Sequence, residues 1–142
     1  MSDRVEGARE TQNASEIVDR VRLEDVSFSE VSGRRLESTS GFAEDPSAKL
    51  MVRENDREVQ ARVELELRSA GAVFQLSSVA TFAKLEPFTM SSASAEEFLQ
   101  KVAVFAIWPY LRAEVQQLSS TLGVSAVALP LLRQGEVQLQ GT

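Results

Sequence analysis

Acid–base chemistry in this sequence would have to come from carboxylates, because the 142 residues include 21 Asp and Glu but neither His nor Cys. The usual zinc sites, Ser-His-Asp triads and Cys-His pairs need His or Cys, so they are excluded. Most of the acids alternate with basic residues along predicted strands, which is typical of a solvated sheet face. Gly-rich phosphate-binding motifs do not occur either. We therefore expect a protein that is not an enzyme and binds no cofactor or metal.

The charge pattern narrows the classes of partner. The net charge of -6 and the lack of a Lys or Arg cluster argue against nucleic acid or an acidic membrane. Residues 1–68 carry 27 of the 36 charged side chains, and residues 69–142 carry nine. Because residues 69–142 carry so little charge, we expect part of their surface to be buried against further copies of the chain. The first thirty residues lack an apolar signal region, which predicts a cytosolic protein.

An uncharged run at residues 102–111 contains the only Trp and the only Tyr of the chain. A transmembrane helix needs about 20 apolar residues, so this run is expected to be buried in the domain or against a partner. Ser94 and Glu97 form a candidate capping box at the start of a helix. The apolar residues that follow have the spacing of one helical face: Phe98, Leu99, Val102, Phe105 and Ala106.

A second apolar stripe with helical spacing follows Pro109. Because proline has no N–H and clashes with the preceding turn, we expect a kink or a fresh helix near it. Gly123 is expected to end the helix in a left-handed conformation. The stripe consists of Leu111, Val115, Leu118 and Leu122.

The middle of the chain alternates apolar and polar residues with period two, at residues 48–52, 59–67 and 72–85. Turn residues at hairpin distances separate these segments, which predicts three neighbouring antiparallel strands. In the third strand apolar residues fall on both faces, so we expect both faces to be covered. Residues 32–35 and 39–46 predict loops.

Residues 1–15 are polar and are expected to form a mobile tail, followed by a single domain over residues 16–142. Residues 17–31 predict a strand whose alternation changes phase at Glu24-Asp25, as a β-bulge would explain. The alternative is a short helix over residues 15–21 and a shorter strand. The predicted fold is α+β, with a four-stranded antiparallel sheet followed by a long kinked C-terminal helix packed on one face.

Three segments resemble the SecB-like protein-export chaperones. Ile107-Trp-Pro-Tyr-Leu-Arg112 resembles the family's hydrophobic-aromatic-Pro-Tyr-x-Arg signature, and Asp25-Val-Ser-Phe28 is similar to its first strand. Gly123 and Ala128-Leu-Pro130 resemble its glycine turn and Leu-x-Pro exit. The resemblance spans residues 20–131. It implies a homotetramer, a dimer of dimers, that holds unfolded or precursor polypeptides in apolar grooves without ATP, with the SecA motor or an antitoxin as further partners.

The resemblance also implies site residues, although packing within one subunit is the alternative for each. The candidates for the client groove are Phe28, Phe42, Leu76, Phe82, Phe105, Trp108 and Tyr110. The candidates for oligomer contacts are Trp108, Tyr110, Leu111, Val115, Leu118 and Leu122. Asp25 is the candidate for partner docking, or else a bulge residue that bonds its own backbone. For Arg112 the resemblance implies a buried or interfacial ion pair.

Departures from the family pattern lie in the acidic patch through which its members engage SecA. Ser29 stands where an acid is expected, with Glu30 one place later and therefore on the other strand face, and Ser78 replaces a second acid. SecB-like chaperones attached to toxin–antitoxin systems are similarly divergent, so an antitoxin is a candidate client. A small α+β scaffold that only dimerises or binds a ligand is the alternative function.

Overall fold

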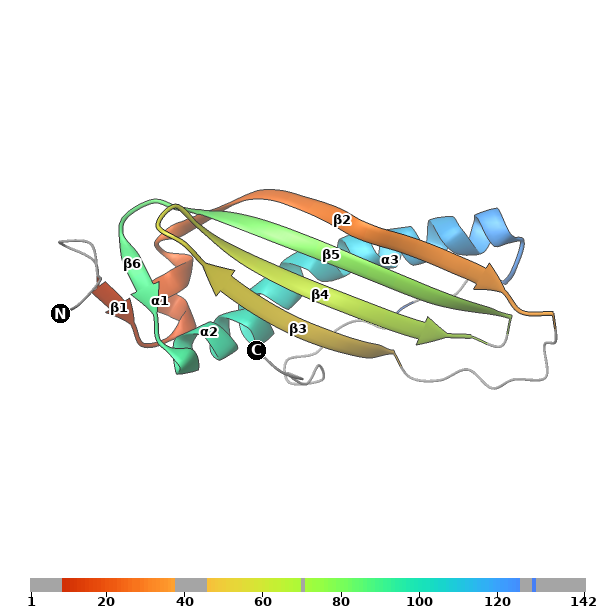
Figure 1. The fold of residues 1–142 in the computed structure, drawn as a ribbon, viewed down its shortest axis with the longest axis horizontal. Coiled ribbons are helices and arrows are strands. Elements are labelled where there is room, and N and C mark those ends of the chain that lie inside the picture. Colours follow the sequence, from red (N-terminus) through yellow and green to blue (C-terminus); the bar gives the residue numbers. More distant parts are fainter. Residues whose placement is uncertain (1–8, 38–45, 70, 126–128, 130–142) are drawn as a thin grey trace.

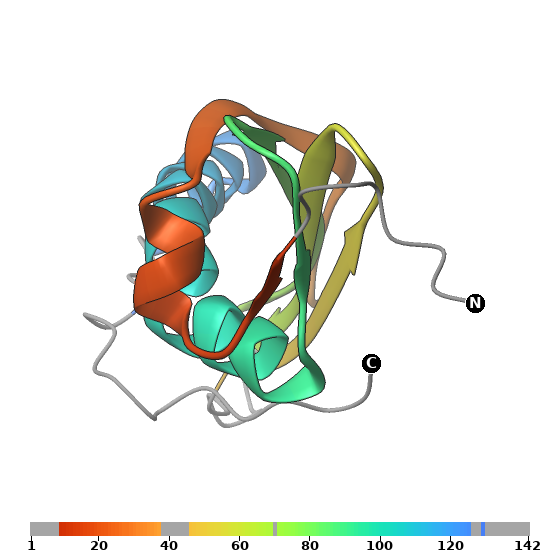
Figure 2. The same ribbon diagram turned by 90° about the vertical axis from the view of Figure 1, so that its left-hand side faces the viewer.

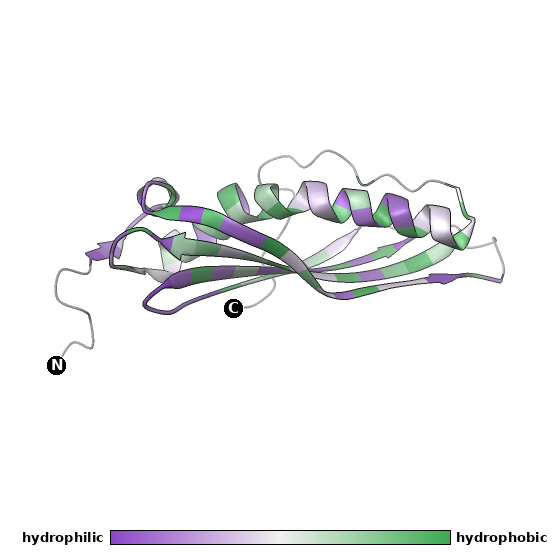
Figure 3. Ribbon diagram, turned by 90° about the horizontal axis from the view of Figure 1, so that it is seen from above, coloured by the Kyte–Doolittle hydropathy of each residue, from purple (hydrophilic) through white to green (hydrophobic). Residues whose placement is uncertain are grey.

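A four-stranded antiparallel sheet is the largest element of the computed structural model, which describes residues 9–37, 46–69, 71–125 and 129. The strand order is β2-β5-β4-β3, so β2 and β3 are the edges (Figure 1). The strands are β2 (Val21–Arg35), β3 (Ser47–Glu54), β4 (Glu58–Arg68) and β5 (Ala72–Lys84). The helical segments on one face are α2 (Ser92–Phe98), the π-helical turn η1 (Leu99–Ala103) and α3 (Val104–Leu122). No described helix lies on the other face (Figure 3), so the predicted α+β architecture is confirmed.

Side-chain alternation places the apolar residues of β3, β4 and β5 toward the helices. The register pairs Leu50 with Val63 and Leu65 with Leu76, and all four side chains are buried. Polar side chains alternate with them and point to the outer face of the sheet, since neighbouring residues in a strand face opposite ways. The three strands that the period-two pattern predicts are confirmed.

β2 extends further than the sequence predicts. Residues 32–35 were expected to form a loop, but they pair with the start of β5 as far as Arg35. Gly33 explains the close packing there, because a Cβ atom at this position would lie 3.2 Å from Leu122 Cδ1 and 3.3 Å from Phe74 Cδ1. The loop prediction is therefore wrong for this segment, and the end of α3 packs directly against β2. Residues 38–45, with most of the second predicted loop, lie outside the described residues.

The segment before β2 closes one end of the molecule (Figure 2). β1 (Arg9–Thr11) pairs in parallel with β6 (Phe88–Met90), and α1 (Ala14–Val18) follows it. Ile17 of α1 is fully buried, so the helix alternative is correct and the strand beginning at Ile17 is wrong. The tail prediction is also wrong for residues 9–15, because their backbone joins β1 and α1 to the folded domain. Residues 1–8 lie outside the described residues.

Glu97 connects α2 to the start of α1. Its Oε1 accepts a hydrogen bond of 2.7 Å from the N–H of Ala14, and its Oε2 lies 3.5 Å from Lys101 Nζ. The Ala14 hydrogen bond, opposed by some desolvation and assisted by Lys101, holds the pKa of Glu97 below its ordinary value. The cap of α2 is Ser91, whose Oγ accepts from the N–H of Ser94 at 3.1 Å. The predicted Ser94–Glu97 capping box is therefore wrong.

Replacing Glu97 with Gln is expected to destabilise the protein at neutral pH and to matter less in acid. A carboxyl whose folded-state pKa is lowered stabilises the fold above its unfolded-state pKa of about 4.3, and this contribution is lost as the pH falls through the folded-state pKa. Urea unfolding at several pH values between about 7 and 3 should show the stability gap closing in that window. Glu96→Gln, an exposed side chain one residue earlier, is the matched control. A gap for Glu97→Gln that stays constant with pH would contradict this assignment.

Candidate functional site

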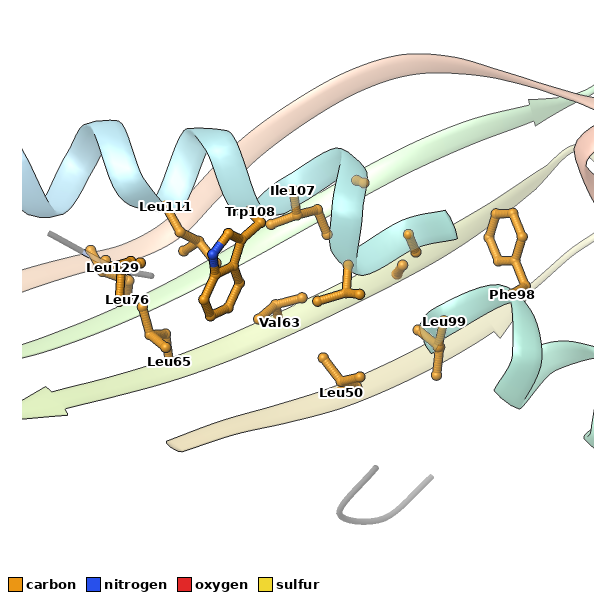
Figure 4. Close-up of a cluster of buried hydrophobic side chains, with 14 of the residues drawn as sticks. Leu50, Val63, Leu65, Leu76, Phe98, Leu99, Ile107, Trp108, Leu111 and Leu129 are labelled. Atoms are coloured by element: carbon orange, nitrogen blue, oxygen red, sulfur yellow. The ribbon is translucent and has the colours of Figure 1, made fainter. Parts of the chain in front are cut away.

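One apolar layer fills the space between α3 and the sheet, and we call it the inner layer (Figure 4). Trp108 points from α3 toward the strands, and every side chain of the layer is at most 5 % exposed. No helix among the described residues is long and apolar enough to cross a membrane. The inner layer consists of Leu50, Val63, Leu65, Leu76, Phe98, Leu99, Ile107, Trp108, Leu111 and Leu129.

The π-helical turn η1 decides which residues of α3 enter the inner layer. A π-turn holds an extra residue, so after Leu99 the buried positions move to Ala103 and Val104 and then to Ile107 and Trp108. The predicted helical face is therefore correct for Phe98 and Leu99, which are buried, and in part for Val102 and Ala106, which are half-buried and packed against the core. It is wrong for Phe105, which the π-turn leaves exposed.

α3 continues through Pro109 to Gly123. Of the two alternatives predicted for Pro109, the fresh helix is wrong, and the irregular turn of this helical segment lies upstream, in η1. Gly123 ends α3 with φ of 68°, as predicted, and the N–H of Val124 bonds to the carbonyl of Ser119 at 3.1 Å. This left-handed cap satisfies carbonyls at the end of the helix and reverses the chain.

The seven predicted groove side chains do not share one accessible surface. Three of them are buried within the subunit: Leu76, Phe82 and Trp108. Phe105 and Tyr110 are 37 % and 48 % exposed on α3, and Phe28 is half-buried on β2. Phe42 lies outside the described residues. A client could therefore touch the buried three only if a side chain that now fills the inner layer moved aside.

The predicted oligomer contacts divide in the same way. Trp108, Leu111 and Val115 are covered by the sheet of their own subunit, so here they belong to the core instead. Tyr110 is exposed, and two further candidates are half-buried: Leu118 and Leu122. These three keep surface that a second copy could cover.

An apolar strip, which we call the edge strip, runs along the open edge of the sheet. It consists of Leu23, Val26, Phe28 and Val31 on the helix-facing side of β2. Leu23 and Val31 are each 42 % exposed, and β2 has a paired neighbour on one side only. An edge strand with exposed apolar side chains is a ready surface for association. Of these four side chains, only Phe28 was predicted to line a client groove.

Two β-bulges keep the edge strip on one face. The register against β5 shifts between Leu23 and Asp25, as predicted, and again between Phe28 and Glu30. The second shift was not predicted, although Phe28 and Val31 are separated by three residues in the same way as Leu23 and Val26. That repeated spacing was the signal available in the sequence.

The second bulge also places Glu30 on the outer face, opposite Ser77. This is the same face as that of the exposed Asp25, which lies opposite Thr81. The prediction that Glu30 lies on the other strand face is therefore wrong. Ser78 faces inward, where it is fully buried and its Oγ donates to the Ser27 carbonyl at 3.2 Å. Ser78 therefore does not stand at an outer-face position, whereas Glu30 shares the outer face with Asp25.

The outer face also has a shallow hollow of about 290 Å³ near the middle of the sheet. Arg62 beside it is already engaged, because its Nη1 donates to Ser77 Oγ at 3.3 Å. Within the described ranges no three acidic side chains come together as a metal site would require. The hollow is lined by Met51, Val52, Arg53, Gln60, Arg62 and Val79.

Arg112 is half-buried, and its Nε has no hydrogen-bond partner among the residues that the structure describes. An N–H that is buried without an acceptor costs about 1–3 kcal/mol. The predicted ion pair is not formed within the described part of the chain. An acceptor from another chain would remove this cost.

Comparison with known proteins finds a sequence relative and structural neighbours that are all chains of solved structures. No protein-family model matches the chain. The SecB-like chaperone SmegB of Mycolicibacterium smegmatis is 37% identical over 142 residues, covering 94% of this chain and 90% of that protein. The Mycobacterium tuberculosis Rv1957 SecB-like chaperone, in complex with a ChAD peptide from the Rv1956 HigA1 antitoxin, matches with a TM-score of 0.74. This match covers 84% of this chain and 93% of that chain at 16% identity, so it concerns the fold.

Proposed function

The chain belongs to the SecB-like chaperone family, and on this premise we propose that it holds a non-native segment of an antitoxin in the cytosol, without ATP. The observation that carries the choice of client is that a solved chaperone of this fold holds an antitoxin peptide. The edge strip and the exposed rings of α3 supply apolar surface of the kind that a holding chaperone needs, with charged side chains around it for solubility.

The test is suppression of aggregation by the purified full chain. A chemically unfolded reporter protein is diluted into buffer with and without the chaperone, and turbidity is recorded with and without ATP. We expect suppression at near-equimolar chaperone and no effect of ATP. An antitoxin encoded beside this gene should then be protected from proteolysis more strongly than a secretory precursor. A chain that leaves the aggregation of every client unchanged would refute the proposal.

We further propose that copies associate through the edge strip, as the oligomer expected of the family would require. Pairing along β2 would cover Leu23 and Val31 and would give partners to the open backbone edge. It would also bring a second chain close to the half-buried side chains beside α3.

The double variant Leu23→Asp/Val31→Asp is expected to be a monomer at concentrations where the wild type is an oligomer. Two carboxylates placed in the contact would lose hydration and repel the partner's carboxylates. Light scattering coupled to gel filtration measures the native mass. Leu85→Asp, at an exposed apolar residue outside the strip, is the matched control and should keep the wild-type mass. An unchanged native mass in the double variant would show that the copies associate through another surface.

SecA remains a second candidate partner because Asp25 and Glu30 share the outer face. Two acidic side chains on a sheet face without a helix cover could dock a basic surface. Binding of purified SecA, lost in Asp25→Asn/Glu30→Gln, would favour this partner. Binding of the antitoxin should be unaffected by the same change.

A further inference from the structure

We propose that the outer face of the sheet docks one extended segment of a partner protein, which places an acidic residue over one hollow and a basic residue over the next. The hollow near the middle of this face, which we call the arginine hollow, takes the acidic residue. A second hollow beside it, which we call the glutamate hollow, takes the basic residue. This contact goes beyond the proposed function, because it lies on the side of the sheet without a described helix (Figure 3) and needs no unfolded client.

The arginine hollow has two cations on its rim. Arg53 is exposed and Arg62 is half-buried, and neither guanidinium forms an ion pair with any residue that the structure describes. Their hydrogen bonds go to neutral groups, since Arg53 Nε donates to Gln60 Oε1 at 2.9 Å and Arg62 Nη1 donates to Ser77 Oγ at 3.3 Å. In a chain with a net charge of -6, this hollow is a local site of the opposite sign.

The floor between the two arginines is apolar. Met51 lies opposite Arg62 on one side and Val79 lies opposite it on the other, and both side chains are half-buried. A guanidinium group can bind a carboxylate through two parallel hydrogen bonds, and an apolar neighbour of the carboxylate would cover the floor. The volume of about 290 Å³ is at the lower end of the range for small-molecule pockets. The hollow therefore suits an acidic side chain beside an apolar one.

The glutamate hollow, of about 320 Å³, has the opposite charge. Its lining includes three carboxylates, from Glu30, Glu64 and Glu66, and one cation, Lys49. No carboxylate lines the arginine hollow. The two hollows thus form neighbouring positive and negative sites on one face of the sheet.

The spacing of the two hollows sets the spacing of charges in the partner segment. On β3, Arg53 and Lys49 belong to different hollows, and on β4 so do Arg62 and Glu66. Each pair is four residues apart along its strand, which corresponds to about 13 Å. An extended segment has the same rise per residue, so its acidic and basic residues stand about four positions apart.

The glutamate hollow also decides which anions the face rejects. Like charges placed opposite each other suppress binding of the wrong partner. A polyanion such as a nucleic acid would bring a second negative charge to the three carboxylates. A segment with one acid and one base at the stated spacing meets an opposite charge in both hollows.

Fluorescence anisotropy of short blocked peptides with an uncharged dye, titrated with the purified full chain, tests the proposal. The probe peptide contains Asp-Leu, with Lys at the fourth position after Asp and Gly or Ser elsewhere. The comparison peptides have Asn and Gln, two Asp or two Lys at the charged positions. At low salt we expect the probe to bind about threefold or more tighter than each of the others. Added salt should reduce this preference, because it screens exposed charges.

The variant Arg53→Gln/Arg62→Gln is expected to bind the probe no more tightly than the neutral peptide. Arg34→Gln/Arg68→Gln is the matched control, because it removes two exposed arginines that flank Val73 on the same face, outside both hollows. It should keep the wild-type affinity. The variant Arg53→Glu/Arg62→Glu should prefer the peptide with two Lys, a gain of binding that misfolding cannot produce.

Several results would overturn the proposal. They are equal affinity of the wild type for all the peptides, wild-type affinity in Arg53→Gln/Arg62→Gln, and an equal loss in the control pair, which would show a general effect of charge. Displacement of the probe by inorganic phosphate at a concentration similar to that of the probe would show a simple anion site without the stated spacing. Because the peptides are short and unstructured, the result stands whether or not the chain suppresses aggregation.

Discussion

Replacing Trp108 with alanine is expected to lower the free energy of unfolding by about 3–5 kcal/mol. The indole is 5 % exposed and fills the middle of the inner layer, between α3 and the strands (Figure 4). Its removal deletes a large apolar contact and leaves a cavity, because the surrounding strands are paired on both sides and cannot collapse fully. Urea unfolding followed by far-ultraviolet circular dichroism measures the change without relying on tryptophan emission.

Tyr110→Ala is the matched control, since Tyr110 is an aromatic residue two positions later with 48 % of its surface exposed. Its loss should change the stability by no more than about 1 kcal/mol. If Trp108→Ala lowers the free energy of unfolding by as little as Tyr110→Ala, the indole is peripheral. If Tyr110→Ala instead has a smaller native mass than the wild type but the same free energy of unfolding, the exposed ring is supported as an oligomer contact.

Local patterns predicted the parts of the fold that local physics controls. β4 alternates buried and solvated residues along its whole length, so its faces follow from period two alone. Gly123 ends α3 because a left-handed cap is open to few other residues. The first bulge of β2 was visible as a change of phase, and the aromatic-Pro-Tyr-x-Arg segment predicted the family.

Other features depend on contacts between segments that are far apart in sequence. Short β1 pairs with β6, about eighty residues later, and three residues are too few for a periodic signal. The π-turn in η1 shifts the helical face by one residue, which exposed Phe105 and buried Val104. For the site, the sequence identified Leu76 and Trp108 as apolar and central, but it could not show that both side chains are buried within their own subunit.

A second strong effect is expected at Glu54, which joins three elements at the end of the sheet. Glu54 Oε1 lies 2.7 Å from Lys84 Nζ, and its Oε2 accepts from the N–H of Met90 at 2.9 Å. Lys84 Nζ also donates to the carbonyl of Phe88 at 2.8 Å and lies 4.6 Å from the centre of the Phe88 ring. The side chain of Lys84 is only 4 % exposed. These partners therefore stabilise its ammonium group in place of water.

Glu54→Ala is therefore expected to cost about 3 kcal/mol or more, because it leaves a buried ammonium group without its counter-charge. Lys84→Met should cost less, since Glu54 is 24% exposed and keeps both water and the N–H of Met90. Removing both charges in Glu54→Ala/Lys84→Met should restore part of the stability lost in Glu54→Ala, because apolar replacement of a buried ion pair is often neutral.

Urea unfolding of the wild type, the two single variants and the double variant completes a thermodynamic cycle, from which the coupling between the two side chains is obtained. We expect the double variant to lose less free energy of unfolding than the two single variants lose together. A strictly additive result, with Glu54→Ala costing less than about 1 kcal/mol, would show a solvated surface contact instead. In that case β6 would be held by its pairing with β1 and by the burial of Phe88 alone.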